Sequence, residues 1–132
     1  MIFGLGKLRL RGPDSSIVTE GPILEEYRNA EEIGRVRLGE TYLFYRDLGK
    51  RYYVPYTYID RSFTRISECQ PDDSPAYYYY RLILVHEGKE FANLIFNKEE
   101  QVDRIHEALQ EKHPEIAYGY VPPAEGERAR FR

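Results

Sequence analysis

The sequence predicts a mainly β fold of the α+β class: a strongly bent antiparallel sheet or partly open barrel of about seven strands, closed by one C-terminal helix. Three observations support this prediction. The 132 residues include 13 Tyr and 6 Phe, and aromatic residues favour strands. Short alternations of polar and apolar residues, separated by turn residues, fill the stretch between Gly34 and Phe96. One apolar stripe with helical spacing follows between Lys98 and Lys112.

The N-terminal third contains one clear strand pattern and one ambiguous segment. Residues 7–11 alternate as a strand does, and residues 12–15 form a turn because they contain Gly, Pro, Asp and Ser. Residues 23–27 fit either a short helix after Pro22 or a strand, and periodicity leaves both open. Residues 1–20 are an extension that the predicted fold does not place.

The middle of the chain predicts a series of strands joined by tight turns. These strands cover residues 35–38, 41–45, 51–55 and 59–67. Gly39-Glu40 forms the first turn, and Asp47 to Lys50 forms the second. Pro55 limits its strand to a sheet edge or a strand end, because proline lacks a backbone N–H. Residues 70–75 form a surface loop with two prolines and two aspartates.

A long hairpin follows, with strands over residues 77–86 and 89–96 joined by a two-residue Glu87-Gly88 turn. A tight turn pairs His86 with Lys89. Continuing the regular ladder pairs Leu84 with Phe91 on the same face as Leu82.

A helix over residues 98–112 closes the predicted fold. Asn97 caps it, and Glu100 three residues later completes a capping box. Val102, Ile105 and Leu109 form an apolar stripe that must pack on the sheet. We predict one domain over residues 1–118 and a mobile tail over residues 119–132, which lack periodicity.

Charge and composition exclude several classes of protein. The formal net charge is −3, without the basic excess of a nucleic-acid-binding domain. The single cysteine cannot form an intramolecular disulfide and indicates a reducing, cytoplasmic location. No apolar run approaches the roughly 20 residues that span a bilayer, so we expect a soluble or at most peripheral protein.

The candidates for chemistry are sparse. Cys69 and His86 form a conceivable thiolate–base pair without a third orienting group, and a lone cysteine is usually a small buried hydrophobe. His106 and His113 lie seven apart, too far to bind one ion together. Asp72-Asp73 is typical of a solvated loop, and residues 4–7 are half of a phosphate-binding loop without its Ser or Thr. We therefore predict no catalytic residue, no cofactor and no metal.

The strand series carries a resemblance to a known superfold. Successive short strands, the step Val54-Pro55-Tyr56 before Ile59, a long final hairpin and one closing helix resemble the pleckstrin-homology-like superfold, especially its bacterial and GRAM-related branches. The resemblance covers residues 23–113 and makes residues 23–28 the first strand. It implies a non-catalytic module that binds lipid head groups, peptides or other proteins.

The resemblance also indicates where an anionic lipid would bind. A phosphoinositide site in this superfold needs Lys and Arg between the first two strands, where residues 29–33 instead contain two glutamates. The neighbouring loop carries Arg46, Lys50 and Arg51, so peripheral binding to an anionic membrane through this loop is one hypothesis. The alternative is a set of solvated edge residues that discourage aggregation. The same two interpretations apply to a basic strand face with Lys7, Arg9 and Arg11.

The tyrosine runs predict a surface that contacts another protein. In a strand, Tyr77 and Tyr79 point to one side while Tyr78 and Tyr80 point to the other, so one pair must be exposed or in an interface. The candidate interface residues are Tyr52, Tyr53, Tyr78 and Tyr79. The alternative is that these tyrosines lie on a solvent-facing sheet and are present because tyrosine favours strands.

The sequence therefore predicts a binding or assembly module that contacts a protein partner or a second copy of itself. Peripheral binding to anionic lipid is the first alternative, and a small enzyme of unrecognised type is the second. Nucleic acid is not an expected partner, because Arg81 alone among the tyrosines is insufficient for a base-stacking platform.

Overall fold

The computed structural model describes residues 8–119, of which 46% lie in strands and 22% in helices. The mainly β class is therefore as predicted. Over these residues the fold has ten strands in two sheets and two α-helices, where about seven strands and one helix were predicted. Residues 120–132 of the predicted tail, and residues 1–7, lie outside the described residues.

The chain divides into two compact units, residues 1–56 and residues 57–132, and each is described by itself. The single domain predicted over residues 1–118 stays a prediction.

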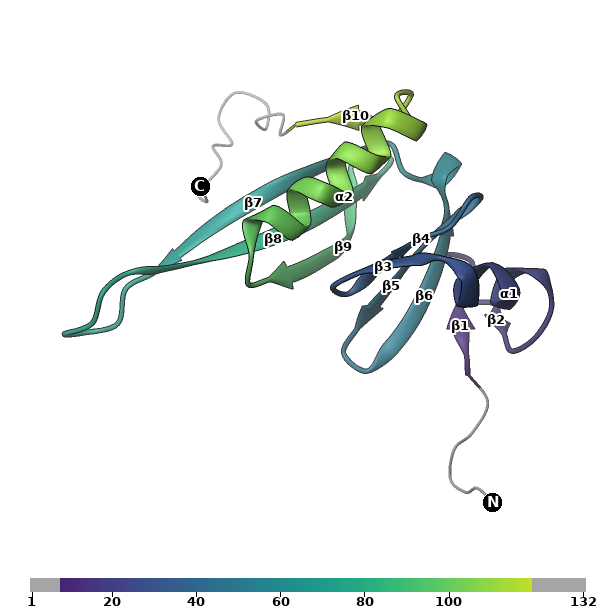
Figure 1. Ribbon diagram of the computed structural model, residues 1–132, viewed down its shortest axis with the longest axis horizontal. Helices are drawn as coiled ribbons and strands as arrows, with labels where there is room; N and C mark the ends of the chain where they lie inside the picture. Colours follow the sequence, from purple (N-terminus) through teal and green to yellow (C-terminus); the bar gives the residue numbers. More distant parts are fainter. Residues whose placement is uncertain (1–7, 120–132) are drawn as a thin grey trace, which may run out of the picture. The chain divides into compact units, whose positions relative to one another are not determined.

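The first unit contains a six-stranded sheet with the strand order β2-β1-β6-β5-β4-β3 (Figure 1). All of its pairs are antiparallel except β1 with β6. Its elements are β1 (Leu10–Arg11), β2 (Ile17–Val18), α1 (Pro22–Asn29), β3 (Glu31–Ile33), β4 (Val36–Leu38), β5 (Tyr42–Asp47) and β6 (Lys50–Pro55). The strands predicted over residues 35–38, 41–45 and 51–55 are confirmed within two residues.

The β5–β6 turn follows from its sequence. Asp47 pairs with Lys50, so Leu48 and Gly49 form a two-residue turn. Both have positive φ, 51° and 78°, which is the type I′ geometry that matches strand twist. Pro55 is the last residue of β6, where its missing N–H is tolerated.

The ambiguous segment after Pro22 is a helix, so the strand that the resemblance placed over residues 23–28 is wrong. Pro22 begins α1, where its fixed φ suits the first helical turn. Leu24 is buried in a cluster with Leu10 and Phe44. This one-sided burial suits a helix covering the sheet. The preceding extension is also placed in part, because β1 and β2 join the sheet edge.

The second unit contains a four-stranded sheet with the order β10-β7-β8-β9. Its elements are β7 (Arg61–Cys69), β8 (Tyr77–His86), β9 (Lys89–Phe96), α2 (Glu99–Lys112) and β10 (Ala117–Tyr118), preceded by the 3-10 helix η1 (Tyr56–Tyr58). The β8–β9 hairpin has the predicted bounds, and His86 pairs with Lys89 as predicted. The 70–75 loop is exposed throughout.

The register inside this hairpin differs from the prediction at one point. β9 contains a β-bulge opposite Leu84 and Val85 of β8. Leu84 pairs with Ala92 and Val85 pairs with Glu90. Phe91 is the extra residue, and the predicted Leu84–Phe91 pair is wrong. Because a bulge shifts the alternation by one, Ala92, Leu94 and Phe96 become the buried set.

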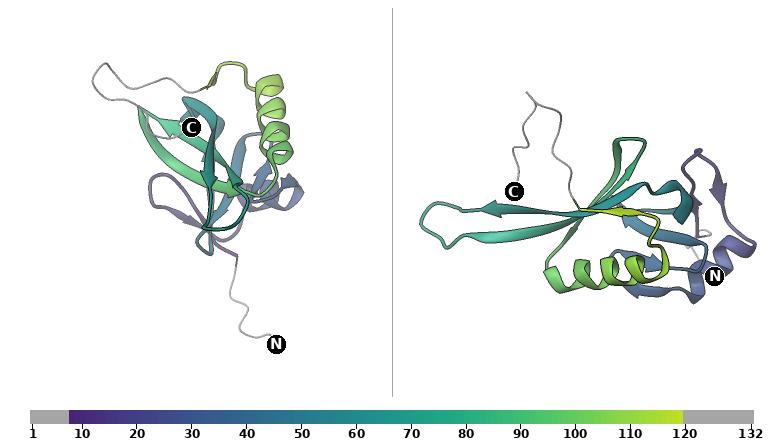
Figure 2. Two further views of the ribbon diagram at one scale, coloured as in Figure 1. Left: turned by 90° about the vertical axis from the view of Figure 1, so that its left-hand side faces the viewer. Right: turned by 90° about the horizontal axis from the view of Figure 1, so that it is seen from above.

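Helix α2 lies along one face of this sheet (Figure 2) and buries the predicted stripe of Val102, Ile105 and Leu109. Its N-cap is Lys98, which makes no capping hydrogen bond, so the predicted Asn97 capping box is wrong. Over residues 8–119, neither helix has the length and apolar character needed to cross a bilayer.

Candidate functional site

Three arginines lie side by side across the first sheet. Arg46 on β5 pairs with Arg51 on β6. The Arg46 N–H donates to the Arg35 carbonyl at 2.9 Å, which continues the ladder into the β3–β4 turn. Residues directly opposite each other in an antiparallel ladder share one face. We call Arg35, Arg46 and Arg51 the arginine row.

The local sequence explains this placement. Gly34 has a φ of 60°, which lets β3 and β4 join through two residues and brings Arg35 to the end of the ladder. The type I′ turn at Leu48-Gly49 ends the neighbouring hairpin at the same side of the sheet. The row therefore lies on one face of the sheet, at the end where the β3–β4 and β5–β6 turns are next to each other.

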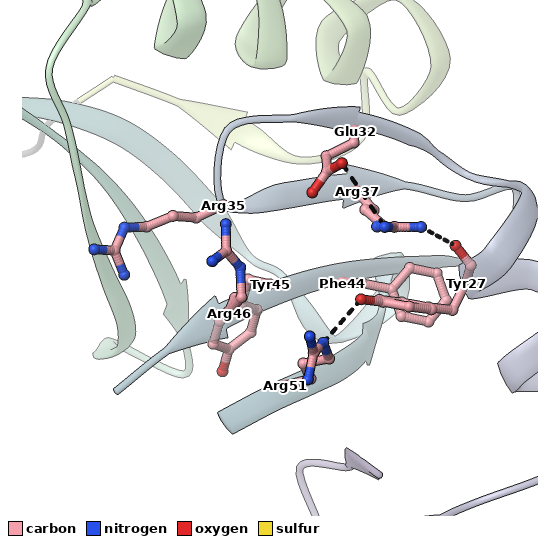
Figure 3. A pocket seen from close by; sticks show the side chains of 8 residues that line it. All are labelled: Tyr27, Glu32, Arg35, Arg37, Phe44, Tyr45, Arg46 and Arg51. Atoms are coloured by element: carbon pink, nitrogen blue, oxygen red, sulfur yellow. Dashed lines mark hydrogen bonds and ion pairs between the residues drawn. The ribbon is translucent and has the colours of Figure 1, made fainter. Parts of the chain in front are cut away.

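Tyr27 of α1 contacts one arginine of the row and one arginine beside it (Figure 3). Its hydroxyl accepts a hydrogen bond from Arg51 Nε at 3.0 Å. Its carbonyl accepts one from Arg37 Nη1 at 3.0 Å, and the Arg37 guanidinium lies 4.3 Å from the centre of its ring. Arg37 also pairs with Glu32 at 3.7 Å.

The arginine row has no carboxylate partner among residues 8–119, since Glu32 contacts Arg37 instead. Like charges directly opposite each other in a sheet are destabilising, so this arrangement costs stability. The depression between the arginines encloses about 10 Å³, enough for about one water molecule. A larger ligand must therefore lie on the surface and meet the guanidinium groups from outside.

Of the three basic residues predicted to form a lipid-binding loop, Arg46 and Arg51 lie opposite each other on one face of the sheet. Lys50 pairs with Asp47, one step along the ladder, and so points to the opposite face. Arg35 and Arg37 belong to the site but were not among its predicted residues. Their alternation in Arg35-Val36-Arg37 was the available signal, since it puts both on one strand face.

The four candidate interface tyrosines do not form one surface within a unit. Tyr53 packs inside the first unit, with its ring against Tyr42 and its hydroxyl 2.9 Å from that of Ser16. Tyr52 stacks on Tyr45, with ring centres 4.9 Å apart. The other two, Tyr78 and Tyr79, belong to the second unit.

The tyrosines of β8 lie on a two-stranded extension of the second sheet. β9 pairs with β8 only from Tyr80 onward, so residues 67–79 form a hairpin that projects past β9 (Figure 1). We call this hairpin the outer ribbon. Tyr77 and Tyr78 are 44% and 47% exposed, on opposite faces of it.

The conceivable thiolate–base pair is not assembled. Cys69 pairs with Tyr77 at one end of β8, and His86 lies at the other end, about 30 Å away at the usual rise per strand residue. The Asp72-Asp73 pair lies in the exposed loop. No group of three or more His, Cys, Asp or Glu residues within 8–119 is placed to hold a metal ion.

His106, considered from the sequence as a surface or helix-end residue, is instead half-buried in the second unit. His106 of α2 lies against β7, with Nε2 2.8 Å from Ser62 Oγ and Nδ1 3.4 Å from Thr64 Oγ1. Burial lowers the pKa of His106 below its ordinary 6.5, and the charge of Asp103 opposes this shift. The available signal was its spacing: His106 lies four residues after Val102 and three before Leu109, so it borders the apolar stripe.

Guanidinium groups form charge-assisted, planar hydrogen bonds that suit phosphate and carboxylate oxygens, so the arginine row is equipped to hold an anion. Comparison of this chain with protein-family models, with curated proteins and with solved structures finds no match.

Proposed function

We propose that this chain is a non-catalytic binding module in which the arginine row binds phosphate groups. One observation carries the proposal: Arg35, Arg46 and Arg51 are adjacent on three chain segments and have no carboxylate partner among residues 8–119. An external anion would remove the like-charge repulsion within the row. Phosphate offers three oxygens to such donors, which suits several arginines.

The order of the elements supports a pleckstrin-homology-like fold for this module. β3 to β9 follow one another in chain order and α2 comes after them; on this proposal β3 takes the place of the first strand that the resemblance put over residues 23–28. Consecutive strands pair antiparallel within β3–β6 and within β7–β9. On this proposal β1, β2, α1 and β10 are additions to the common fold.

Phosphate groups can come from lipid head groups or from a soluble polyphosphate. With a net charge of −3, the chain as a whole is repelled by both, so attraction must be local to the row. Such binding weakens as salt rises, because salt screens exposed charges.

Cosedimentation with vesicles of phosphatidylcholine, with and without phosphatidylglycerol, tests the proposal. We expect binding that needs the anionic lipid, falls with salt and is lost in Arg46→Glu. Lys89→Glu, the same charge reversal at the exposed start of β9, is the matched control and keeps most of the binding. Titration with inositol hexaphosphate detects a soluble phosphate ligand. If Arg46→Glu binds both probes as the unaltered chain does, the proposal is wrong.

A second candidate function, self-association, is favoured by the exposed rings of Tyr77 and Tyr78 on the outer ribbon and by the charges on either side of them. Arg81 lies directly opposite Arg65. Arg65 binds Glu90, whereas Arg81 donates to the amide oxygen of Asn93 and has no carboxylate partner within residues 8–119. Asp73 precedes Tyr77 by four residues and Arg81 follows it by four. If two copies pack antiparallel across Tyr77, the turn that carries Asp73 of each copy lies toward the part of β8 that carries Arg81 of the other.

Light scattering at two protein concentrations tests self-association. We expect a dimer that Arg81→Glu and Asp73→Arg each weaken and that the double variant restores, because the two charges are exchanged. A monomer at both concentrations would exclude this candidate and leave the arginine row proposal untouched.

A further inference from the structure

The tip of the β5–β6 hairpin carries an exposed leucine. Leu48 is 89% exposed, whereas the other exposed large apolar residues among 8–119 range from 38% to 49%. Single exposed apolar residues are common on protein surfaces, so exposure alone assigns no role. The backbone at this position supplies a second observation.

Leucine is poorly suited to its backbone conformation here. Leu48 occupies the first central position of a type I′ turn, with a φ of 51°. This position favours Asn, Asp or Gly, because the Cβ of other residues is crowded at positive φ. The turn therefore accepts both strain and apolar exposure, although asparagine would relieve both.

The flanking residues add a charge pattern. Arg46 lies two residues before Leu48 and Arg51 three after it, with the exposed Lys50 between. Asp47 is the one acidic residue of the turn, and it stands opposite Lys50 in the ladder. An apolar tip with basic flanks matches the surface of an anionic bilayer, where phosphates lie just outside the acyl chains.

We propose that Leu48 inserts into the interface of an anionic lipid bilayer while the arginine row binds the phosphates above it. This inference rests on the proposed function and names a bilayer as the source of the phosphate groups. It also explains why the row extends to the outer end of the hairpin, because Arg46 and Arg51 are the last pair but one before the turn.

Tryptophan fluorescence tests insertion directly, because the chain contains no tryptophan. In Leu48→Trp, we expect a blue-shifted emission on phosphatidylglycerol vesicles and quenching by lipids brominated on their acyl chains. Ile95→Trp replaces an exposed apolar residue of β9 and is the matched control, with neither change expected. An unshifted, unquenched Leu48→Trp would overturn the inference, as would a blue shift that needs only a higher protein concentration.

A second variant separates this inference from the proposed function. Leu48→Asn suits the turn, so it keeps the fold, but it removes the exposed leucine side chain that would enter the bilayer. We expect roughly tenfold weaker vesicle binding and unchanged affinity for inositol hexaphosphate. If Leu48→Asn binds vesicles as the unaltered chain does, insertion is wrong and the phosphate site stands. If Arg46→Glu also keeps both ligands, the proposed function itself is wrong.

Discussion

Tyr27 holds two of the arginine side chains with different parts of one residue. Its hydroxyl fixes Arg51 through Nε, and its ring and carbonyl fix Arg37. The Arg51 hydrogen bond uses the inner nitrogen of the guanidinium and leaves both Nη groups for a ligand. Tyr27 is therefore a positioning residue for the site rather than a ligand-binding one.

Tyr27→Phe should weaken phosphate binding while leaving the fold nearly unchanged. The ring still packs edge-on against Phe44, but Arg51 loses its acceptor and is ordered only on binding. We expect inositol hexaphosphate affinity to fall about threefold to tenfold, the usual range for one lost hydrogen bond, measured by calorimetry. Tyr42→Phe removes a hydroxyl from the same core as a control. Equal affinities for the two variants would show that Tyr27 does not position Arg51.

Arg46→Thr should stabilise the fold while it weakens binding. Threonine removes the like charge opposite Arg51 and suits a strand, so the free energy of unfolding should rise by about 0.5 kcal/mol. Urea denaturation measures this change. Arg46→Lys keeps the charge and should leave stability almost unaltered. A destabilised Arg46→Thr would mean that Arg46 has a stabilising role that we have not recognised.

Among the elements, α2 gives the clearest test of packing. Leu109 is 1% exposed in the stripe on the second sheet, so Leu109→Ala should cost about 2–5 kcal/mol and Leu109→Asp should unfold the domain. Gln110→Ala, on the exposed side of the same turn, should change stability little. Cys69→Ser should also leave the protein folded. Circular dichroism during thermal unfolding measures all four, and a folded Leu109→Asp would refute this packing.

The N-terminus of α2 can be improved. Lys98 has the extended backbone of an N-cap but makes no side-chain capping bond. Lys98→Asp adds an acceptor for the free N–H groups and a negative charge at the positive helix end, so stability should rise by about 1 kcal/mol. Lys98→Ala lacks the acceptor and is the control. Equal melting temperatures for the two variants would contradict this explanation.

The elements were largely predictable from the sequence because their signals are local. Turn residues predicted where the β5–β6 and β8–β9 hairpins reverse. The helical spacing of apolar residues predicted the buried stripe of α2. The bulge at Phe91 was not predictable, because alternation alone does not show where a ladder gains a residue. The helix after Pro22 depends on burial of Leu24 against strands far along the chain, so propensity left it open.

At the scale of the molecule, the site shows the limit of sequence reasoning most clearly. Arg46 and Arg51 were predictable because one short turn joins them. Arg35 joins them through a ladder between strands, and Tyr27 through a helix that covers the sheet. Strand register and tertiary packing decide whether charged residues from separate segments come together. Neither could be inferred from the local patterns of this sequence.

Stability of the molecule should depend on the protonation of His106. Its folded-state pKa lies below the unfolded value of about 6.5, so the unfolded chain binds the proton more tightly. Stability should therefore be fully present above pH 6.5 and decrease as pH falls from there through the folded pKa. Urea denaturation between about pH 5 and pH 7 measures this loss. His106→Gln should remove that part of the pH dependence, and an unchanged slope would contradict the assignment.

The bulge in β9 governs where this chain can change in length. Because Phe91 is the extra residue of the ladder, its deletion would leave Ala92 opposite Leu84 and Glu90 opposite Val85. Losing or gaining one residue between Ala92 and Phe96 would instead turn part of the buried set outward. Insertions and deletions in this strand should therefore be tolerated at the bulge and selected against on either side of it.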